Sequence, residues 1–266
     1  MTKSQSSTPT DLRVQALLWL FGLVFLLVFL GLPAIPQDTG YFDFADKRPW
    51  LGISNAFNVL SNLPYFLVGY LGFSYTHAHR NDKTKFIDRS ETTAFYIAFA
   101  GIFLVGLGSG WFHWAPEMST LAADRLPMTI GFMAILAIII SERINLRAGK
   151  TLLPVLLFIG VLSVGWWIAT ERMADLPGDL RLYGLVQFFP VVAIVLMLLW
   201  FPPRYQGTRY LILILVCCGL VKIAEGLDGQ ICDLTGKIIS GHSLKHLLAA
   251  LATYYLVVYL RKREPA

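Results

Sequence analysis

The residues best suited to chemistry in this chain are three histidines, His113, His242 and His246, together with Ser109 and Asp124. Ser109 and His113 are four residues apart, as are His242 and His246, so each pair shares one face of a helix. Imidazole is costly to place in or near hydrocarbon without a partner. Because all three lie at the ends of apolar segments, we predict that they meet at one membrane depth around a metal ion.

Three neutral imidazoles with one open position are the composition of a catalytic zinc site. Zinc held in this way lowers the pKa of its water to about 7, which supplies hydroxide at neutral pH. Asp124 is then placed to take the proton of the water and pass it to a leaving group. Ser109 could donate a hydrogen bond to the developing oxyanion. The alternative for a His-x-x-x-His pair is an interfacial or hydrogen-bonded role, and only convergence from separate segments favours the metal.

The composition is that of a membrane protein. The chain has 266 residues, of which 56% are hydrophobic and 15% charged, whereas a soluble domain has about a quarter charged residues. Apolar runs of nearly 20 residues recur along the whole length, which indicates several membrane-spanning helices. The three cysteines lack paired spacing and indicate neither a disulfide framework nor a thiolate site.

We predict an all-α polytopic fold in which one extra N-terminal helix precedes a seven-helix bundle. The predicted regions are a disordered tail over 1–12, the extra transmembrane helix over 13–32 and the core over 33–266. The eight predicted spans are 13–32, 53–75, 92–113, 120–141, 152–170, 181–201, 208–225 and 242–260.

The net charge of +5 does not indicate nucleic-acid binding, because most basic residues lie in alternate loops. All basic loops fall on one side if both termini are cytoplasmic. This arrangement places the histidines on the periplasmic or luminal side.

At these residues the chain resembles the alkaline ceramidase family, within a superfamily of seven-helix membrane zinc hydrolases and related adiponectin-receptor-like proteins. The resemblance runs from about Tyr41 to the C-terminus. It is carried by Asn58–Leu63, Gly108–Ser109 with Phe112–His113, Asp124 with Pro127–Met128, and His242 with His246. It implies a zinc-dependent amidase that cleaves the N-acyl bond of ceramide or a ceramide-like lipid. By the same resemblance, the three histidines hold the zinc and Asp124 and Ser109 assist catalysis.

Two departures from the family concern Lys245 and calcium. Lys245 stands inside the final motif where eukaryotic members carry Trp, so their sphingoid-base specificity is not carried over. The family also has a calcium site before its first core helix. The corresponding residues here would be Asp43, Asp46 and Asn55, and a solvated acidic loop is the simpler interpretation because Asn55 replaces an acidic ligand.

Four further residues are predicted near the metal as supporting or substrate-contacting groups. Asp228 is the first choice to orient His242 or His246, because carboxylates often hold metal-bound histidines. Glu225 could do the same or form a helix-end ion pair. Tyr183 could donate to a substrate carbonyl, although an interfacial aromatic anchor is the preferred interpretation. Lys245 could contact the substrate.

The predicted function is therefore hydrolysis of a lipid that enters from the bilayer, with the amide at the metal and the tails among the helices. The alternatives are a receptor-like protein with structural zinc, or a zinc hydrolase acting on another acyl lipid. The compact loops favour a bacterial inner membrane. The sequence leaves acyl length, physiological substrate and oligomeric state open.

Overall fold

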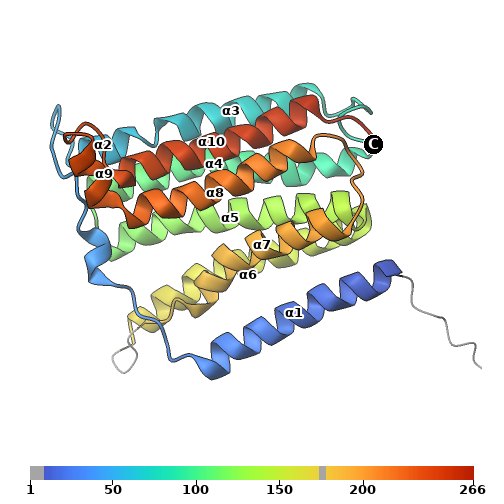
Figure 1. The fold of residues 1–266 in the computed structure, drawn as a ribbon, viewed down its shortest axis with the longest axis horizontal. Coiled ribbons are helices and arrows are strands. Elements are labelled where there is room, and N and C mark those ends of the chain that lie inside the picture. The colour runs from blue at the N-terminus through green and yellow to red at the C-terminus, as the bar shows by residue number, and fades with distance from the viewer. Residues whose placement is uncertain (1–8, 174–177) are drawn as a thin grey trace, which may run out of the picture.

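The computed structural model describes residues 9–173 and 178–266, which are helical almost throughout (Figure 1). The long helices run roughly parallel or antiparallel to one another. Their bounds are α1 Pro9–Gly31, α2 Ala56–Leu60, α3 Leu63–Ala78, α4 Thr92–Trp114, α5 Met118–Arg143, α6 Leu146–Glu171, α7 Arg181–Trp200, α8 Thr208–Gly226, α9 Asp228–Leu234 and α10 Gly241–Lys262, with short 3-10 helices η1 Thr39–Phe42 and η2 Arg89–Glu91. Part of the predicted disordered tail, residues 1–8, lies outside the described residues, and α1 already begins at Pro9.

The prediction of eight spans is met in part. Six helices in the described ranges are long and apolar enough to cross a membrane: α1, α4, α5, α6, α7 and α10. The helices α8 and α9 add a seventh if they form one span bent by 82°. Several apolar helices of this kind indicate an integral, multi-pass membrane protein.

The predicted span over 53–75 is divided between α2 and α3. The helices are interrupted at Ser61 and Asn62, and α3 has 16 residues, about 24 Å of helix, which is shorter than the roughly 30 Å of a bilayer core. Ser61 and Asn62 both turn polar side chains toward the carbonyl of Asn58, at 2.9 and 2.8 Å. Such local hydrogen bonds compete with regular helix, which explains the interruption.

The N-terminal helix α1 packs along α7 in the opposite direction. Near one end Arg181 donates to the backbone oxygens of Phe29 and Leu32, and near the other Arg13 donates to that of Trp200. In Figure 1 α1 lies at the edge of the bundle, beyond α6 and α7. Most of its large apolar side chains are exposed, as expected for a helix that faces lipid.

A buried ionic cluster closes the end of the bundle where the chain terminates. Arg263 is 0% exposed and donates to Glu142 at 2.5 Å, and Tyr259 donates to the same carboxylate at 2.5 Å. Arg143 is also buried and donates to Thr208 at 2.7 Å. The basic residues at this end therefore include two internal structural groups, Arg143 and Arg263, beside those of the loops.

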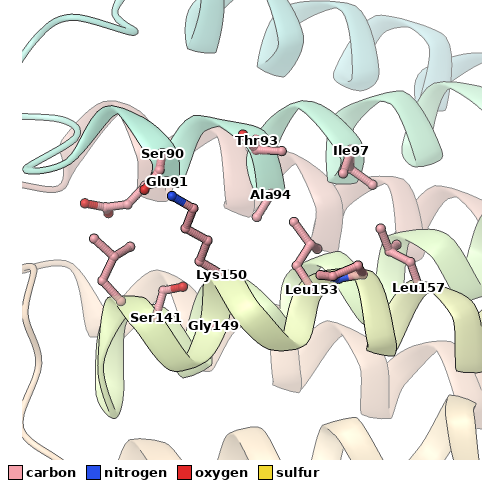
Figure 2. Close-up of a pocket in the computed structure, with 12 residues that line it drawn as sticks. Ser90, Glu91, Thr93, Ala94, Ile97, Ser141, Gly149, Lys150, Leu153 and Leu157 are labelled. Atoms are coloured by element: carbon pink, nitrogen blue, oxygen red, sulfur yellow. The ribbon is translucent and has the colours of Figure 1, made fainter.

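A groove opens at the same end, between the N-terminal part of α4 and the first turns of α6 (Figure 2). Apolar side chains form most of its walls, and Lys150 and Glu91 stand near its mouth. The lining residues are Ser90, Glu91, Thr93, Ala94, Ile97, Ser141, Leu146, Gly149, Lys150, Leu153, Pro154 and Leu157. His113 lies at the opposite end of α4, so this groove is separate from the histidines.

Candidate metal centre

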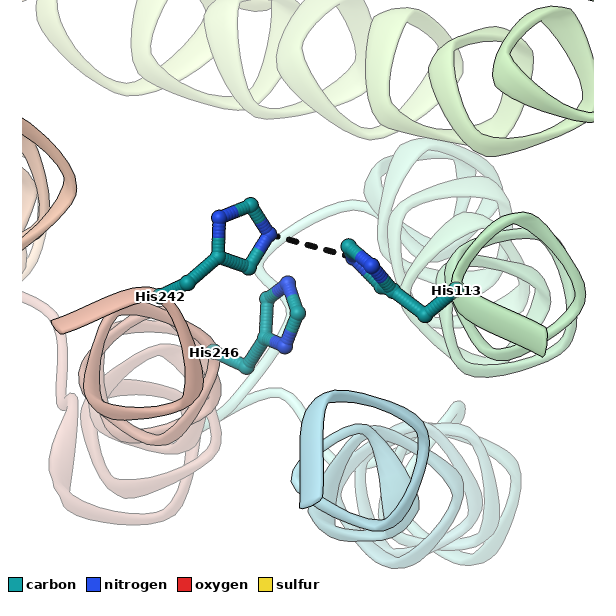
Figure 3. A group of neighbouring side chains, drawn as sticks. All are labelled: His113, His242 and His246. Atoms are coloured by element: carbon teal, nitrogen blue, oxygen red, sulfur yellow. Dashed lines mark hydrogen bonds between the residues drawn. The ribbon is translucent and has the colours of Figure 1, made fainter. Parts of the chain in front are cut away.

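The three histidines predicted to meet do lie together. The ring centroids of His113, His242 and His246 are 4.7 to 5.0 Å apart, and one ligand atom from each lies within 4.8 Å of the others. All three are buried. Figure 3 shows His113 approaching from α4 and the other two from the first turns of α10. The four-residue spacing of His242 and His246 places both rings on the same face of α10.

The spacing of the ring nitrogens suits a small divalent ion. Nε2 of His113 lies 3.2 Å from Nε2 of His242. Tetrahedral zinc with Zn–N distances of about 2.0–2.1 Å has ligand nitrogens roughly 3.3 Å apart. Nδ1 of His113 is buried and has no hydrogen-bond partner among the described residues. The close pair of Nε2 atoms and this unpartnered ring fit a metal better than a hydrogen-bonded cluster.

The tautomer of His246 follows from its neighbours on α2. The Ser61 hydroxyl has one proton, and it donates this proton to the backbone oxygen of Asn58 at 2.9 Å. Nδ1 of His246 lies 2.8 Å from the same hydroxyl oxygen, so the ring nitrogen is the donor in this contact. The proton on Nδ1 leaves the lone pair of Nε2 free for a metal.

His113 is fixed through its backbone and its ring faces. Its carbonyl oxygen accepts a hydrogen bond from Asn55 Nδ2 at 2.8 Å. Phe44 packs edge-on against the rings of both His113 and His242, with centroids 4.8 Å away in each case. Phe44 is itself 4% exposed. The segment before α2 therefore covers the three histidines with an apolar side chain and limits the access of bulk water.

A close approach of α4 to α5 brings Ser109 beside Asp124. A Cβ atom on Gly108 would lie 2.2 Å from the backbone oxygen of Ala123, so only glycine allows the helices this near. The Ser109 side chain interacts with the Asp124 carboxylate. Both side chains are buried, and Ser109 lies one helical turn before His113. The predicted catalytic pair is thus assembled next to a predicted metal ligand.

Asp228 contacts the metal-binding helix through its backbone. Its Oδ1 accepts a hydrogen bond from the backbone nitrogen of His242 at 2.7 Å, and its Oδ2 accepts one from Ala45 at 3.0 Å. A Cβ on Gly241 would lie 2.7 Å from the Asp228 Cα, which shows how closely α9 meets the start of α10. We predicted that Asp228 orients a histidine ring. The structure instead has it capping α10 and anchoring the segment that carries Phe44.

Lys245 and Glu225 form an ion pair within the site. Lys245 Nζ donates to Glu225 Oε1 at 2.6 Å, and Lys222 donates to Oε2 at 2.8 Å. The Lys245 ammonium also lies 5.5 Å from the ring centroid of Tyr41. Burial raises the pKa of the Tyr41 phenol, so this hydroxyl is neutral at physiological pH. The ion-pair interpretation of Glu225 agrees with these contacts, with Lys245 as its buried partner.

Tyr183 is buried rather than interfacial. It is 7% exposed and belongs to an apolar cluster with Phe112 and Trp167. Its ring also contacts the Arg125 guanidinium, whose Cζ lies 4.7 Å from the ring centroid. This position does not suit an anchor at the membrane surface, which was the preferred interpretation. A contact with substrate stays a prediction.

The three residues of the predicted calcium site have other partners. Asp43 pairs with Lys47, and its side chain is 78% exposed. Asp46 pairs with Arg48 at 2.7 Å, and this hydrogen-bonded pairing lowers the pKa of the Asp46 carboxyl. Asn55 donates to the backbone of His113. These contacts give no support to a shared calcium cage, and calcium binding stays an untested prediction.

No specific role was predicted from the sequence for the polar residues in and beside α2. Asn58 is 0% exposed and contacts three segments: its Nδ2 donates to the Asp46 oxygen, its Oδ1 accepts from Ser243, and its backbone oxygen accepts from Ser61. The feature of the sequence that could have indicated such a role is the group of polar residues in an otherwise apolar segment, namely Asn55, Asn58, Ser61 and Asn62.

The comparison with known families agrees with this geometry. The family model described as Ceramidase matches residues 52–263, a range that contains the three histidines, Ser109, Asp124 and the polar residues of α2. A search of curated proteins finds no match. The match covers well over half of the chain and leaves out α1. By this match, and with its buried cluster of three histidines, the chain is a member of the Ceramidase family.

Proposed function

We propose that this protein is an intramembrane zinc-dependent amidase that hydrolyses the N-acyl bond of ceramide or a ceramide-like lipid to a sphingoid base and a fatty acid. One observation carries the proposal: three buried imidazoles converge, and the buried side chains of Ser109 and Asp124 interact with each other one helical turn from His113. Membership of the Ceramidase family supports an amidase. The apolar helices that surround the site support a lipid substrate.

His113, His242 and His246 would hold the zinc. When bound, zinc supplies a water of lowered pKa and polarises the carbonyl under attack. The chain itself holds the imidazoles in the required state, since Ser61 fixes the protonated nitrogen of His246. Phe44 keeps the site dry by covering two of the rings, and electrostatic interactions are stronger in such a dry site.

Asp124 and Ser109 act as one unit in this proposal. In the resting site the Ser109 hydroxyl would donate to the Asp124 carboxylate, with which it interacts. When Asp124 takes a proton during the attack, it loses its negative charge, and the hydrogen bond from Ser109 becomes weaker. Ser109 is then free to donate to the oxygen on which negative charge develops. Asp124 returns the proton to the departing nitrogen, which leaves as an amine.

The proposed orientation has both termini in the cytoplasm and the metal centre toward the periplasmic or luminal side. The histidines lie at the end of the bundle opposite to the C-terminus, and most basic loop residues belong to the C-terminal end. Lysines and arginines favour the cytoplasmic side. We propose a bacterial inner membrane as the location. Reporter fusions at the C-terminus and at residue 235 test this orientation, because they must report opposite sides.

The test of the proposed function uses purified, full-length protein in detergent. We expect about one zinc per chain and release of fatty acid from ceramide. Single His113→Ala, His242→Ala or His246→Ala variants should lose both. Asp124→Asn should keep the zinc and the fold but lose turnover, which separates an enzyme from a receptor-like protein with structural zinc. Full activity of metal-free protein contradicts the proposal, whereas turnover of a different acyl lipid would reassign the substrate.

A further inference from the structure

Arg125 carries a buried charge beside the proposed catalytic carboxylate. It follows Asp124 on α5 and is 7% exposed. None of the ion pairs among the described residues includes it, and its Nη2 donates to an uncharged acceptor, Gln37 Oε1, at 2.6 Å. Its Nη1 is buried and has no hydrogen-bond partner among the described residues. A guanidinium is always protonated, and a buried N–H donor without an acceptor is unfavourable.

Aromatic rings surround this guanidinium. Its Cζ lies 4.5 Å from the ring centroid of Trp167, 4.7 Å from that of Tyr183 and 5.7 Å from that of Tyr41. Cation–π attraction offsets part of the cost of the buried charge. It does not supply an acceptor for Nη1, because the ring faces shield the charge without replacing a hydrogen bond to oxygen.

Trp167 provides a second unpartnered donor in the same cluster. The side chain is 1% exposed, and its Nε1 has no hydrogen-bond partner in the part of the chain that the structure describes. Buried indole N–H groups normally find an acceptor. The neighbouring Trp166 illustrates this, because its Nε1 donates to Asp179 at 3.1 Å. Arg125 and Trp167 therefore each have an N–H donor that lacks an oxygen acceptor. The positive charge of Arg125 favours an anionic acceptor.

The two donors lie close to the proposed reaction centre. Asp124 precedes Arg125 on the helix, and the ring of Tyr41 connects Arg125 with Phe112, whose centroid is 6.1 Å from that of Tyr41. Phe112 directly precedes the ligand His113. On its other side, Trp167 lines a groove between the start of α5 and the end of α6. The groove is bounded by Glu117, Met118, Ser119, Ala122, Trp167, Ile168, Glu171 and Arg172.

We propose that Arg125 Nη1 and Trp167 Nε1 bind an anionic oxygen group, a carboxylate or a phosphate, in the head of the lipid substrate. This inference rests on the proposed function and adds to its substrate class ceramide-like N-acyl lipids whose head carries an acidic group. The amide lies at the metal, while the acidic group lies a few bonds away in the aromatic cage. A free fatty acid carries the same chemistry, and the experiment below distinguishes it from the head group.

The test compares N-dodecanoylglycine with N-dodecanoylethanolamine, which differ in the carboxylate alone. Zinc-loaded protein should have the higher kcat/KM for the glycine lipid. Arg125→Gln and Trp167→Phe should each lower the ratio of the two kcat/KM values by about tenfold, as expected for the loss of one charge-assisted hydrogen bond. Trp166→Phe is the matched control, because the same change there removes a donor to Asp179 and should leave the ratio unaltered.

Lipid binding to Asp124→Asn protein, measured by isothermal titration, provides a readout independent of turnover. The glycine lipid should bind about tenfold more weakly when Arg125→Gln or Trp167→Phe is added. If neither of these lipids nor ceramide is hydrolysed, the proposed function fails, and this binding difference still decides the inference. The inference is overturned if all variants have the same ratio of the two kcat/KM values and bind the glycine lipid equally well. It is also overturned if the variants weaken only competition by free dodecanoate, because the site would then serve the fatty acid product.

Discussion

The replacement of Ser61 by alanine is the most informative single change, because it reaches the metal without altering a ligand. The hydroxyl oxygen lies 2.8 Å from His246 Nδ1 and, since it donates to the Asn58 oxygen, accepts the hydrogen bond from the ring N–H. In Ser61→Ala this N–H loses its near acceptor in a site where His246 is 5% exposed. The imidazole can then adopt the other tautomer or tilt, and either response removes Nε2 from its best position for zinc.

The expected magnitude follows from the contact that is lost. A buried donor without an acceptor costs about 1–3 kcal/mol, and loss of a partner of a metal-bound histidine typically lowers metal affinity about 10- to 100-fold. The two estimates agree, since a tenfold change corresponds to about 1.4 kcal/mol. We therefore expect zinc affinity to fall by one to two orders of magnitude while the helical content is retained.

The assay is competition for zinc between the purified protein and a chromophoric chelator. Ser163→Ala is a close control, because Ser163 is also buried and donates to a backbone oxygen three residues earlier, at 2.7 Å from Gly160. It does so in α6 and has no described contact with a histidine. If Ser61→Ala and Ser163→Ala both bind zinc as tightly as the unaltered protein, the tautomer argument for His246 is refuted.

Three further predictions concern the catalytic pair, the cap of α10 and the loop before α2. Gly108→Ala should reduce lipid turnover at least tenfold, because the added Cβ would lie 2.2 Å from the Ala123 oxygen and separate Ser109 from Asp124; equal kcat/KM in the variant would contradict this. Asp228→Ala should lower the free energy of unfolding by about 1–3 kcal/mol, because two backbone N–H groups lose their acceptor; thermal unfolding of the zinc-free protein measures it, with Asp233→Ala as control. The pKa of Asp46 is lowered by hydrogen bonds from Arg48, so this carboxylate stabilises the fold above its unfolded pKa of about 4 and loses that effect as the pH falls through its lower folded value. Asp46→Asn should therefore make the midpoint of thermal unfolding less sensitive to pH below about 4, and an unchanged slope would be evidence against it.

The grouping of His242 with His246, and of His113 with Ser109 and Asp124, could be expected from the sequence, because each depends on local geometry. Pairs four residues apart occupy one helix face whatever the rest of the fold does, and His113 and Asp124 are joined by a short connection. Neighbouring antiparallel helices bring such ends to the same level. For these reasons the meeting of His113, Asp124 and Ser109 needed only the correct assignment of α4 and α5.

The contacts that hold the site could not be predicted in the same way. Ser61 and His246 are 185 residues apart, and a polar residue in an apolar segment indicates a hydrogen bond without identifying its partner. Asp228 was expected near His242, but whether it binds the ring or the backbone depends on the 82° bend between α8 and α9. That bend arises from the packing of the helices, and the spacing of apolar residues in the sequence does not indicate it. The same limit applies to Arg263, whose burial depends on Glu142 in a distant helix.

The number of ligands bears on whether the metal is structural or catalytic. Structural zinc is closed by four protein ligands, whereas catalytic zinc keeps a position open. The ligand group found among the described residues has three members, and the three cysteines are not in it. A buried carboxylate and a hydroxyl lie beside this group instead of completing it. A structural zinc site does not require a carboxylate and a hydroxyl beside its ligands. The number of ligands and the Ser109–Asp124 contact therefore together favour a catalytic role over a purely structural one.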